Sequence, residues 1–272
     1  MFAGLSETAL RFGVFIAVFA ALAALELLRP RRSLTAVKAQ RWFTNLAIVG
    51  IDGLVVRAMA LLAVPIAGTA AAVFAALNGV GLLNWLELPS WVSIAILVVA
   101  LDFAIWLQHV ATHKIPILWR VHQVHHADVD IDVSTAVRFH PIEIALSVVW
   151  NLVCVALLGA PVAAVVLFEI VLNACAMFSH ANIELPDRAD QLLRCLIVTP
   201  DMHRVHHSVI RREHDSNFGF NLSVWDRIFK TYLADPENGH ENMRIGLPSY
   251  QSEAPTRLGW SLLLPFRRAR DQ

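Results

Sequence analysis

The chain has 272 residues, of which 57% are apolar and 16% are charged, and its mean hydropathy is +0.56. A soluble domain of this length carries about 25% charged residues, so the composition indicates a membrane protein. The 22 basic and 22 acidic residues balance, which leaves no overall basic surface of the kind that binds nucleic acid. The cysteines Cys154, Cys175 and Cys195 have no metal-binding spacing, so neither a disulfide framework nor a thiolate site is predicted.

The first two apolar runs predict membrane-spanning helices. Residues 9–28 are about as long as a helix that crosses a hydrocarbon core of ~30 Å. No basic segment precedes this run, so we expect an anchor that stays in place and not a cleaved signal peptide. Residues 43–67 contain Asp52 and Arg57. Charged groups are costly in lipid, so these two side chains are expected either to line a cavity or to pair with other helices.

The next two apolar runs lead up to the histidines. Residues 69–88 predict a short re-entrant or interfacial helix, because tryptophan and proline at its end suit a membrane interface. Residues 91–108 predict a spanning helix that continues into His109, and Asp102 lies two turns earlier on the same face. A carboxylate can fix the tautomer of a ligand imidazole, so Asp102 is a candidate for orienting His109. A contact between packed helices is the alternative.

Histidines then recur at helical spacing. His109 and His113 are four residues apart, and two later sets share the pattern His-x-x-His-His, namely His122, His125 and His126, then His203, His206 and His207. On a helix each set lies on one face. Any one pair alone could equally be exposed at a polar surface or be buried with hydrogen-bond partners in the core. Eight histidines exceed the four ligands of a tetrahedral zinc site, so together they predict a site for two metal ions.

Residues 144–158 and 161–178 predict a membrane hairpin, because glycine and proline separate the two runs. The second arm carries Glu169, Asn173 and, at its end, His180, at spacings that place them on one face. Polar groups on one face of a membrane helix usually look into the bundle. We therefore expect His180 to be a metal ligand and Glu169 and Asn173 to line a cavity.

Three further features follow the histidine motifs or flank them. His140 stands before a proline where the chain re-enters the membrane, so it is expected to be either a helix cap or a metal ligand. Residues 208–232 are polar and rich in aromatic side chains and are expected to cap the site. His214 lies beside two arginines and a glutamate and is expected at the exposed surface, with orientation of a metal ligand as the alternative. His240 lies in a polar stretch and is expected in an exposed loop.

The arginines and lysines predict the orientation in the membrane. Of the 22 basic residues, all but Arg11 and Arg57 fall within 29–41, 114–138 and 188–270. By the positive-inside rule these three segments are cytoplasmic. The N-terminus is then outside, and both histidine segments lie on the cytoplasmic face.

The histidine motifs, followed by NFGFNLSVWDRIFKTY at 217–232, resemble the fatty acid hydroxylase and sterol desaturase superfamily of integral-membrane di-iron enzymes over residues 102–232. The resemblance implies two iron ions, with O2 as co-substrate, and hydroxylation or desaturation of a lipid such as a fatty acyl chain or sterol. Family members often carry a further His-x-x-x-His, whereas here His180 is followed four residues later by Glu184, which is a weaker candidate ligand. By the same resemblance Asp215 and Asn217 are candidates for orienting the ligands.

The predicted fold is an all-α integral membrane protein. We expect about four transmembrane helices, a shorter interfacial or re-entrant helix, and a cytoplasmic histidine-rich helical cap that holds a dimetal site. The chain is expected to form one membrane-embedded domain, 1–272. Its parts are membrane and interfacial helices at 9–108, the first histidine segment at 109–140, the hairpin at 141–179, the second histidine segment and cap at 180–240, and an amphipathic tail at 241–272.

The predicted activity is O2-dependent hydroxylation of a membrane lipid at a di-iron site, with no catalytic residue beyond the metal ligands. A desaturase with the same site is the nearest alternative. A membrane metal transporter is another, and so is a zinc-dependent lipid hydrolase with Glu143 or Glu184 as base. Imidazole suits both iron and zinc. Electrons are expected from an external donor, a cytochrome b5- or ferredoxin-type protein with its reductase, because the chain has neither His-Pro-Gly-Gly nor GxGxxG.

Overall fold

The computed structural model describes residues 7–61, 68–86, 88–159 and 161–267. Within these ranges the chain is helical, with three isolated β-bridges and no β-strand. The expected all-α class is therefore confirmed. Six segments are long and apolar enough to cross a membrane, so the chain is a multi-pass membrane protein.

Five of these six segments are single helices of 18 to 25 residues. They are α1 (Glu7–Leu28), α2 (Lys38–Leu61), α5 (Ser90–Lys114), α7 (Pro141–Leu158) and α8 (Val162–His180). The sixth, Gly68–Trp85, is divided into α3 (Gly68–Leu77) and α4 (Leu82–Trp85). At about 1.5 Å per residue α3 covers only half of a hydrocarbon core, as expected of a re-entrant helix. The expected count of about four spanning helices was too low, because each hairpin arm is long enough to cross alone.

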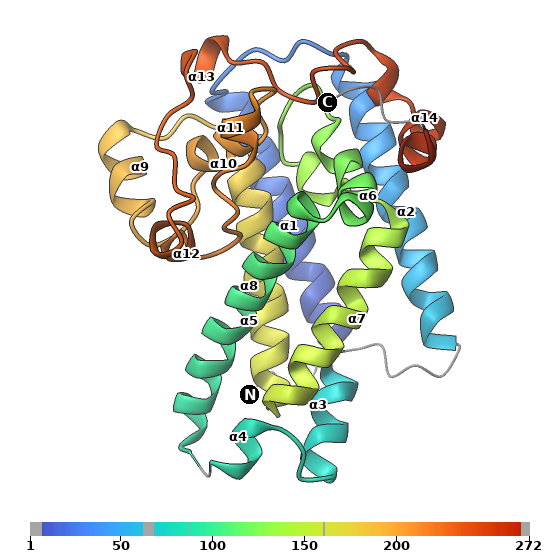
Figure 1. The fold of residues 1–272 in the computed structure, drawn as a ribbon, viewed down its shortest axis with the longest axis vertical. Helices are drawn as coiled ribbons and strands as arrows, with labels where there is room; N and C mark the ends of the chain where they lie inside the picture. The colour runs from blue at the N-terminus through green and yellow to red at the C-terminus, as the bar shows by residue number, and fades with distance from the viewer. Residues whose placement is uncertain (1–6, 62–67, 87, 160, 268–272) are drawn as a thin grey trace.

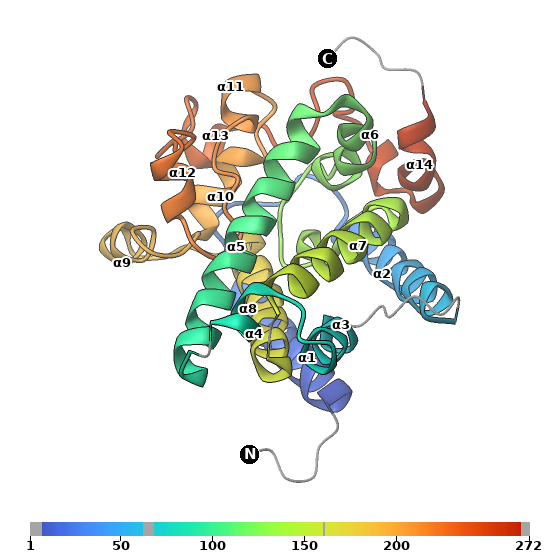
Figure 2. The same ribbon diagram turned by 60° about the horizontal axis from the view of Figure 1, so that its bottom comes forward.

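The long helices stand roughly side by side, with α6 and α10 at one end of the bundle (Figure 1). Helix α8 contacts both α1 and α5, while α2 packs on α7 (Figure 2). The two short helices α3 and α4 lie at the opposite end, where α3 packs on α7 and α8. This arrangement brings the carboxyl ends of α5 and α8 and the amino end of α7 to the same side of the bundle.

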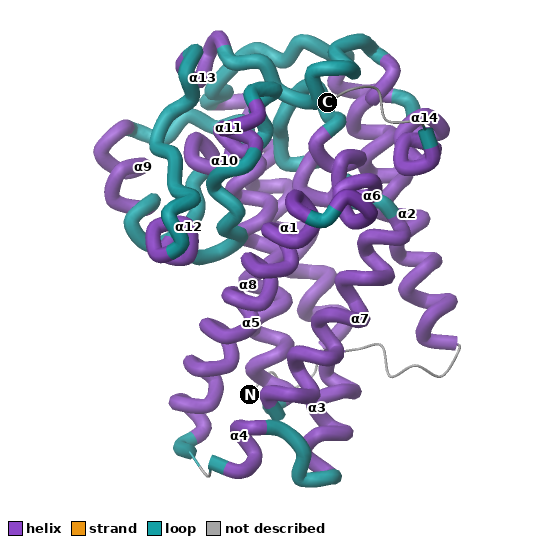
Figure 3. The backbone as a smooth tube through the Cα atoms, in the orientation of Figure 1, coloured by secondary structure: helices purple, strands orange, loops and turns teal. Residues whose placement is uncertain are grey.

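A cap of short helices and loops covers the histidine end (Figure 3). It contains α6 (Pro116–His126), η1 (Thr135–Val137), α9 (Asp187–Leu193), α10 (Pro200–His206), α11 (Arg211–His214), α12 (Val224–Ile228), α13 (Gly239–Asn242), η2 (Ala254–Thr256), α14 (Leu258–Leu263) and η3 (Leu264–Phe266). Proline at the first turn starts α6, α7 and α10, because its fixed φ suits a helix start and it lacks a donor that would go unpaired there. Helix α7 ends at Gly159, which has the positive φ that glycine accepts most readily.

A buried cluster of charges fixes the cap to α2. Arg41 is fully buried, and its Nε and Nη1 donate to Asp128 Oδ1 and Asp132 Oδ2, each at 2.7 Å. Arg138 donates to Asn45 Oδ1 at 2.7 Å and to the carbonyl oxygen of Val124 at 2.9 Å. Removing one partner of a buried ion pair is strongly destabilising. The loop that follows α6 is therefore held in a defined place beside the histidines.

Candidate metal centre

Nine buried histidines form two groups at the cap end of the bundle. Within each group the available ligand atoms all lie within 4.8 Å of one another. The five-histidine group is His109, His113, His122, His126 and His206. The four-histidine group is His125, His180, His203 and His207. The structure thus brings together all nine of the histidines predicted as ligands, and each group could hold a metal ion.

Each group draws residues from three places in the chain. Helices α5, α6 and α10 supply the five-histidine group, while α6, α8 and the end of α10 supply the other. The two groups adjoin, because the rings of His126 and His207 stack with centroids 4.5 Å apart. Adjacent histidines in α6 and in α10 point to different groups, so the doubled histidine of each motif serves both.

The hydrogen bonds of three imidazoles fix their tautomers. The Nδ1 atoms of His109, His206 and His180 lie 2.7, 2.6 and 2.7 Å from the carbonyl oxygens of Phe218, Ser216 and Ala176. A carbonyl oxygen only accepts, so each Nδ1 carries the proton and each Nε2 presents a lone pair. In the five-histidine group, His206 Nε2 and His109 Nε2 are 3.0 Å apart. With both protons on Nδ1, no proton lies between these two Nε2 atoms, so their lone pairs face each other and both can bind one cation.

The spacing of the ring nitrogens also fits metal coordination. Neighbouring ligands at about 2.1 Å from a metal, in octahedral or tetrahedral geometry, are about 3.0 to 3.4 Å apart. The Nε2 atom of His126 lies 3.1 Å from that of His113 and 3.2 Å from that of His122. In the second group, His180 Nε2 lies 3.0 Å from His203 Nε2. Both groups therefore have the donor type and spacing that a bound metal requires.

Burial keeps the cap imidazoles neutral, which is the form that binds metal. It lowers the pKa of His122 to about 3. Burial, reinforced by neighbouring histidines, also holds the pKa of His126, His206 and His207 well below the ordinary value. These ligand atoms are therefore free of protons at neutral pH.

Glu143 is a carboxylate that contacts the five-histidine group. Its Oε1 lies 2.6 Å from His122 Nδ1, and both side chains are buried. When Nε2 is the ligand atom, Nδ1 carries the proton and donates it to this carboxylate. Such a bond orients the ring and raises its basicity. From the sequence, Glu143 was a candidate only as a hydrolytic base, because the pairing of residues 122 and 143 depends on how α7 packs on α6.

Two of the residues predicted to orient ligands lie next to the histidines. Asp215 Oδ1 is 3.8 Å from His113 Nδ1, and its Oδ2 pairs with Lys114 at 3.1 Å. Asn217 has a φ of 51°, and its Nδ2 donates to the carbonyl oxygens of Met202 at 2.9 Å and Leu233 at 2.8 Å. Asn217 thereby connects α10, which carries His203 and His206, to the segment that follows α12.

Three weaker candidates lie outside both groups. His140 caps α7, with Nδ1 accepting from the N–H of Ile142 at 3.2 Å, so the structure supports the cap and not the ligand. Glu184 is exposed. Asp102 accepts from Trp225 Nε1 at 2.7 Å, while His109 bonds instead to a backbone carbonyl. Asp102 therefore holds the cap against α5. It does not orient His109, because the carbonyl oxygen of Phe218 is the hydrogen-bond partner of His109 Nδ1.

The loop that bonds to His109 is itself held by Asp226. Its Oδ1 accepts from Trp106 Nε1 at 3.1 Å and from the N–H of Phe218 at 2.9 Å, and its Oδ2 accepts from the N–H of Gly219 at 2.8 Å. This carboxylate lies in the NFGFNLSVWD stretch quoted above. The stretch can be seen in the sequence, but the contact of Asp226 with α5 and with the 218–219 loop depends on the fold.

His214 was predicted to be exposed, and this was wrong. Its residue is 6% exposed, and its ring lies parallel to that of His206 with centroids 6.0 Å apart. The Trp119 ring is 4.8 Å away. Helix α11 turns this side chain inward while its arginines face outward. His240 was also expected on an exposed surface, but its side chain is only 9% exposed and it lies in α13.

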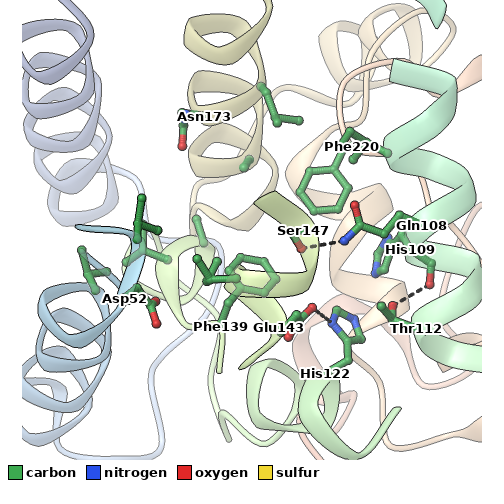
Figure 4. A pocket seen from close by; sticks show the side chains of 18 of the residues that line it. Asp52, Gln108, His109, Thr112, His122, Phe139, Glu143, Ser147, Asn173 and Phe220 are labelled. Carbon is green, nitrogen blue, oxygen red and sulfur yellow. Dashed lines mark hydrogen bonds and ion pairs between the residues drawn. The ribbon is translucent and has the colours of Figure 1, made fainter. Parts of the chain in front are cut away.

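A cavity of about 480 Å³ adjoins the five-histidine group (Figure 4). His109 and His122 lie on its wall, while α1, α2 and α8 contribute largely apolar side chains. Asn173 lines it as predicted, whereas Glu169 lines a separate hollow of about 130 Å³, where it pairs with Arg11 at 2.9 Å. Asp52 lines the main cavity, and Arg57 is exposed.

The bundle, the two histidine groups and the adjoining cavity define an integral-membrane protein with a paired polyhistidine centre. The chain belongs to the fatty acid hydroxylase family, whose model matches residues 94–231, about half of the chain. That range begins within α5 and includes every residue of both groups.

Curated relatives match about half of the chain. Ornithine lipid hydroxylase OlsE of Rhizobium tropici is 28% identical over 144 residues, which are 53% of this chain and 43% of the relative. Alkylglycerol monooxygenase of Homo sapiens is 29% identical over 141 residues, 50% of this chain and 29% of the relative. The chain thus matches less than half the length of these relatives. No solved structure gave a significant match.

Proposed function

We propose that this protein is an O2-dependent hydroxylase of a membrane lipid that holds two iron ions. The observation that carries the proposal is the cavity in which His109 and His122 face a largely apolar space. Family membership and the names of the relatives, a lipid hydroxylase and a monooxygenase, support it. A cavity of this volume lies within the usual range for ligand sites.

The five-histidine group would hold one iron ion, and the four-histidine group would hold the other. Two iron ions, when bound, supply activation of O2 for removal of hydrogen from an unactivated C–H bond. The protein positions that bond, because the apolar walls bind an alkyl chain with one of its carbons beside the five-histidine group. The same walls exclude water from the site. Glu143 holds His122 in orientation.

The four-histidine group lies away from the cavity, since none of its members lines it. We therefore assign the five-histidine group to the substrate side. The basic residues of the cap support a cytoplasmic location for the whole centre. Electrons would reach it from an external donor protein with its reductase.

Metal content and lipid products test the proposal. Wild-type protein, the double variant His206→Ala/His207→Ala and the control His240→Ala are purified from cells supplied with iron, and their metals are measured by mass spectrometry. His240 is a histidine outside both groups, so its variant controls for loss of an imidazole alone. We expect about two irons per chain in the wild type and the control and a loss from both groups in the double variant.

Lipid extracts of the same cells should contain a product one oxygen heavier for the wild type and the control only. Two zinc ions that iron supplementation never displaces would contradict the iron assignment. A product two hydrogens lighter, without one that carries oxygen, would instead assign the desaturase.

A further inference from the structure

Asp52 is a buried carboxylate without a protein partner. It lies on α2, and the residue is 8% exposed. Its Oδ1 is buried and has no hydrogen-bond partner among the described residues. Burying a polar group of this kind without a partner costs several kcal/mol or shifts its protonation. Its hydrogen-bonding capacity is therefore left for water or for a bound molecule.

The carboxylate belongs to the cavity wall. Figure 4 shows it on α2, opposite the wall that α5 forms with Gln108 and His109. Gln108 is already bonded to Ser147 at 2.6 Å, and Glu143 already holds His122. Asp52 therefore lines the cavity with a carboxyl oxygen that no described side chain or backbone group contacts by a hydrogen bond.

The charged residues on the cavity wall determine which head group the bound molecule can have. Among the described residues that line the cavity, the ionisable ones are Asp52, Glu143, His109 and His122, and none is lysine or arginine. An anionic head group on the α2 side would meet the carboxylate of Asp52, and no lysine or arginine among the described lining residues offsets that charge. A hydroxyl or an ammonium group can donate to that carboxylate, which makes a strong, charge-assisted hydrogen bond.

We propose that the cavity binds a lipid with an alkyl chain and a polar group that donates a hydrogen bond to Asp52. This polar group is a hydroxyl or an ammonium. The inference deepens the proposed hydroxylase function and rests on it for the identity of the site. Asp52 is then a specificity-determining residue. It holds the polar group on the α2 wall while the alkyl chain passes the five-histidine group.

Gly53 marks where the cavity opens on α2. The residue is exposed and lines the cavity, and no atom lies within 4 Å of the place where a Cβ would stand. A large side chain can therefore be introduced without a clash on the backbone side. Gly50, one turn earlier, is equally open but does not line the cavity. The two glycines provide a blocking variant and its matched control.

Binding is measured by native mass spectrometry of the purified full chain in detergent. The probes are hexadecan-1-ol, hexadecylamine and hexadecanoate, which share one chain and differ in the head group. We expect Asp52→Leu to weaken binding of the alcohol and the amine about tenfold or more, and not to weaken binding of hexadecanoate. Asp52→Asn keeps an acceptor but no charge, so it should retain the alcohol and lose the amine.

Gly53→Trp should abolish binding of the alcohol, and Gly50→Trp should leave it unchanged. The proposal is overturned if Asp52→Leu leaves the alcohol and the amine bound as before, or if it weakens all three probes equally, which indicates a structural role. Alcohol binding that survives Gly53→Trp would also overturn it, because the probe would then lie elsewhere. These measurements require no turnover, so their failure is distinguishable from a failure of the metal and product assays.

Discussion

Removal of the carboxylate beside His122 should weaken metal binding in the five-histidine group alone. Glu143 Oε1 lies 2.6 Å from His122 Nδ1 in a buried setting. A hydrogen bond to a charged group contributes about 1.5 to 3 kcal/mol, which corresponds to about 10- to 150-fold in affinity. We expect Glu143→Ala to lose this amount. Glu143→Gln keeps an acceptor and should lose about tenfold or less, because only the charge is removed.

The assay is the metal content of protein dialysed against increasing concentrations of a chelator. The chelator concentrations at which the wild type releases its two metals are the reference. Glu143→Ala should release one of its metals at a lower concentration than the wild type does. Glu184→Gln is the control, because that carboxylate is exposed and outside both groups. A profile for Glu143→Ala that matches wild type would refute the role of this contact. An equal shift of both metals would show instead that the variant disturbs the whole cap.

Three further predictions concern the cap. Asn217→Ala removes two donated hydrogen bonds and should lower the free energy of unfolding by about 1 to 3 kcal/mol, measured by thermal denaturation; an unchanged midpoint would contradict this. Burial lowers the pKa of His122 to about 3, whereas an unfolded imidazole titrates near 6.5, so the unfolded state binds more protons between these values. The metal-free protein should therefore lose about 1.4 kcal/mol of stability per pH unit for this histidine as the pH falls below about 6.5, and equal midpoints at about pH 7 and pH 5 would refute it. His214→Phe should retain both metals, because His214 belongs to neither group and phenylalanine preserves its stacking; loss of a metal would make His214 a ligand.

Much of the metal site was predictable because helical spacing is a local property. The nine predicted histidines came from the i, i+3 and i, i+4 pattern and from one polar face of the second hairpin arm. The structure places all nine in the two groups. The spanning helices were predictable for a related reason, since length and hydropathy are also local. How the histidines divide between two groups was not predictable, because it depends on the angle at which α6 and α10 meet α5 and α8.

The contacts that orient the ligands could not be predicted from spacing. Glu143 and His122 are 21 residues apart, and Phe218 and His109 are 109 residues apart. His214 was misplaced because its neighbours in sequence are charged, while its neighbours in space are aromatic. Asp102 was a candidate for orienting His109 because both lie on one helix face, with a packing contact as the alternative, and the carbonyl oxygen of Phe218 takes the place beside His109 Nδ1. Long-range packing decides each of these cases.

The order of the histidines along the chain has a consequence for biosynthesis. His206 completes the five-histidine group, and His203 and His207 complete the four-histidine group. All three lie beyond α8, the last of the candidate membrane spans among the described residues. A ribosome therefore finishes every one of these spans before it delivers the final ligands. Neither metal site can be complete on the nascent chain until the membrane bundle that shields it has been synthesised, so metal loading is a late step of assembly.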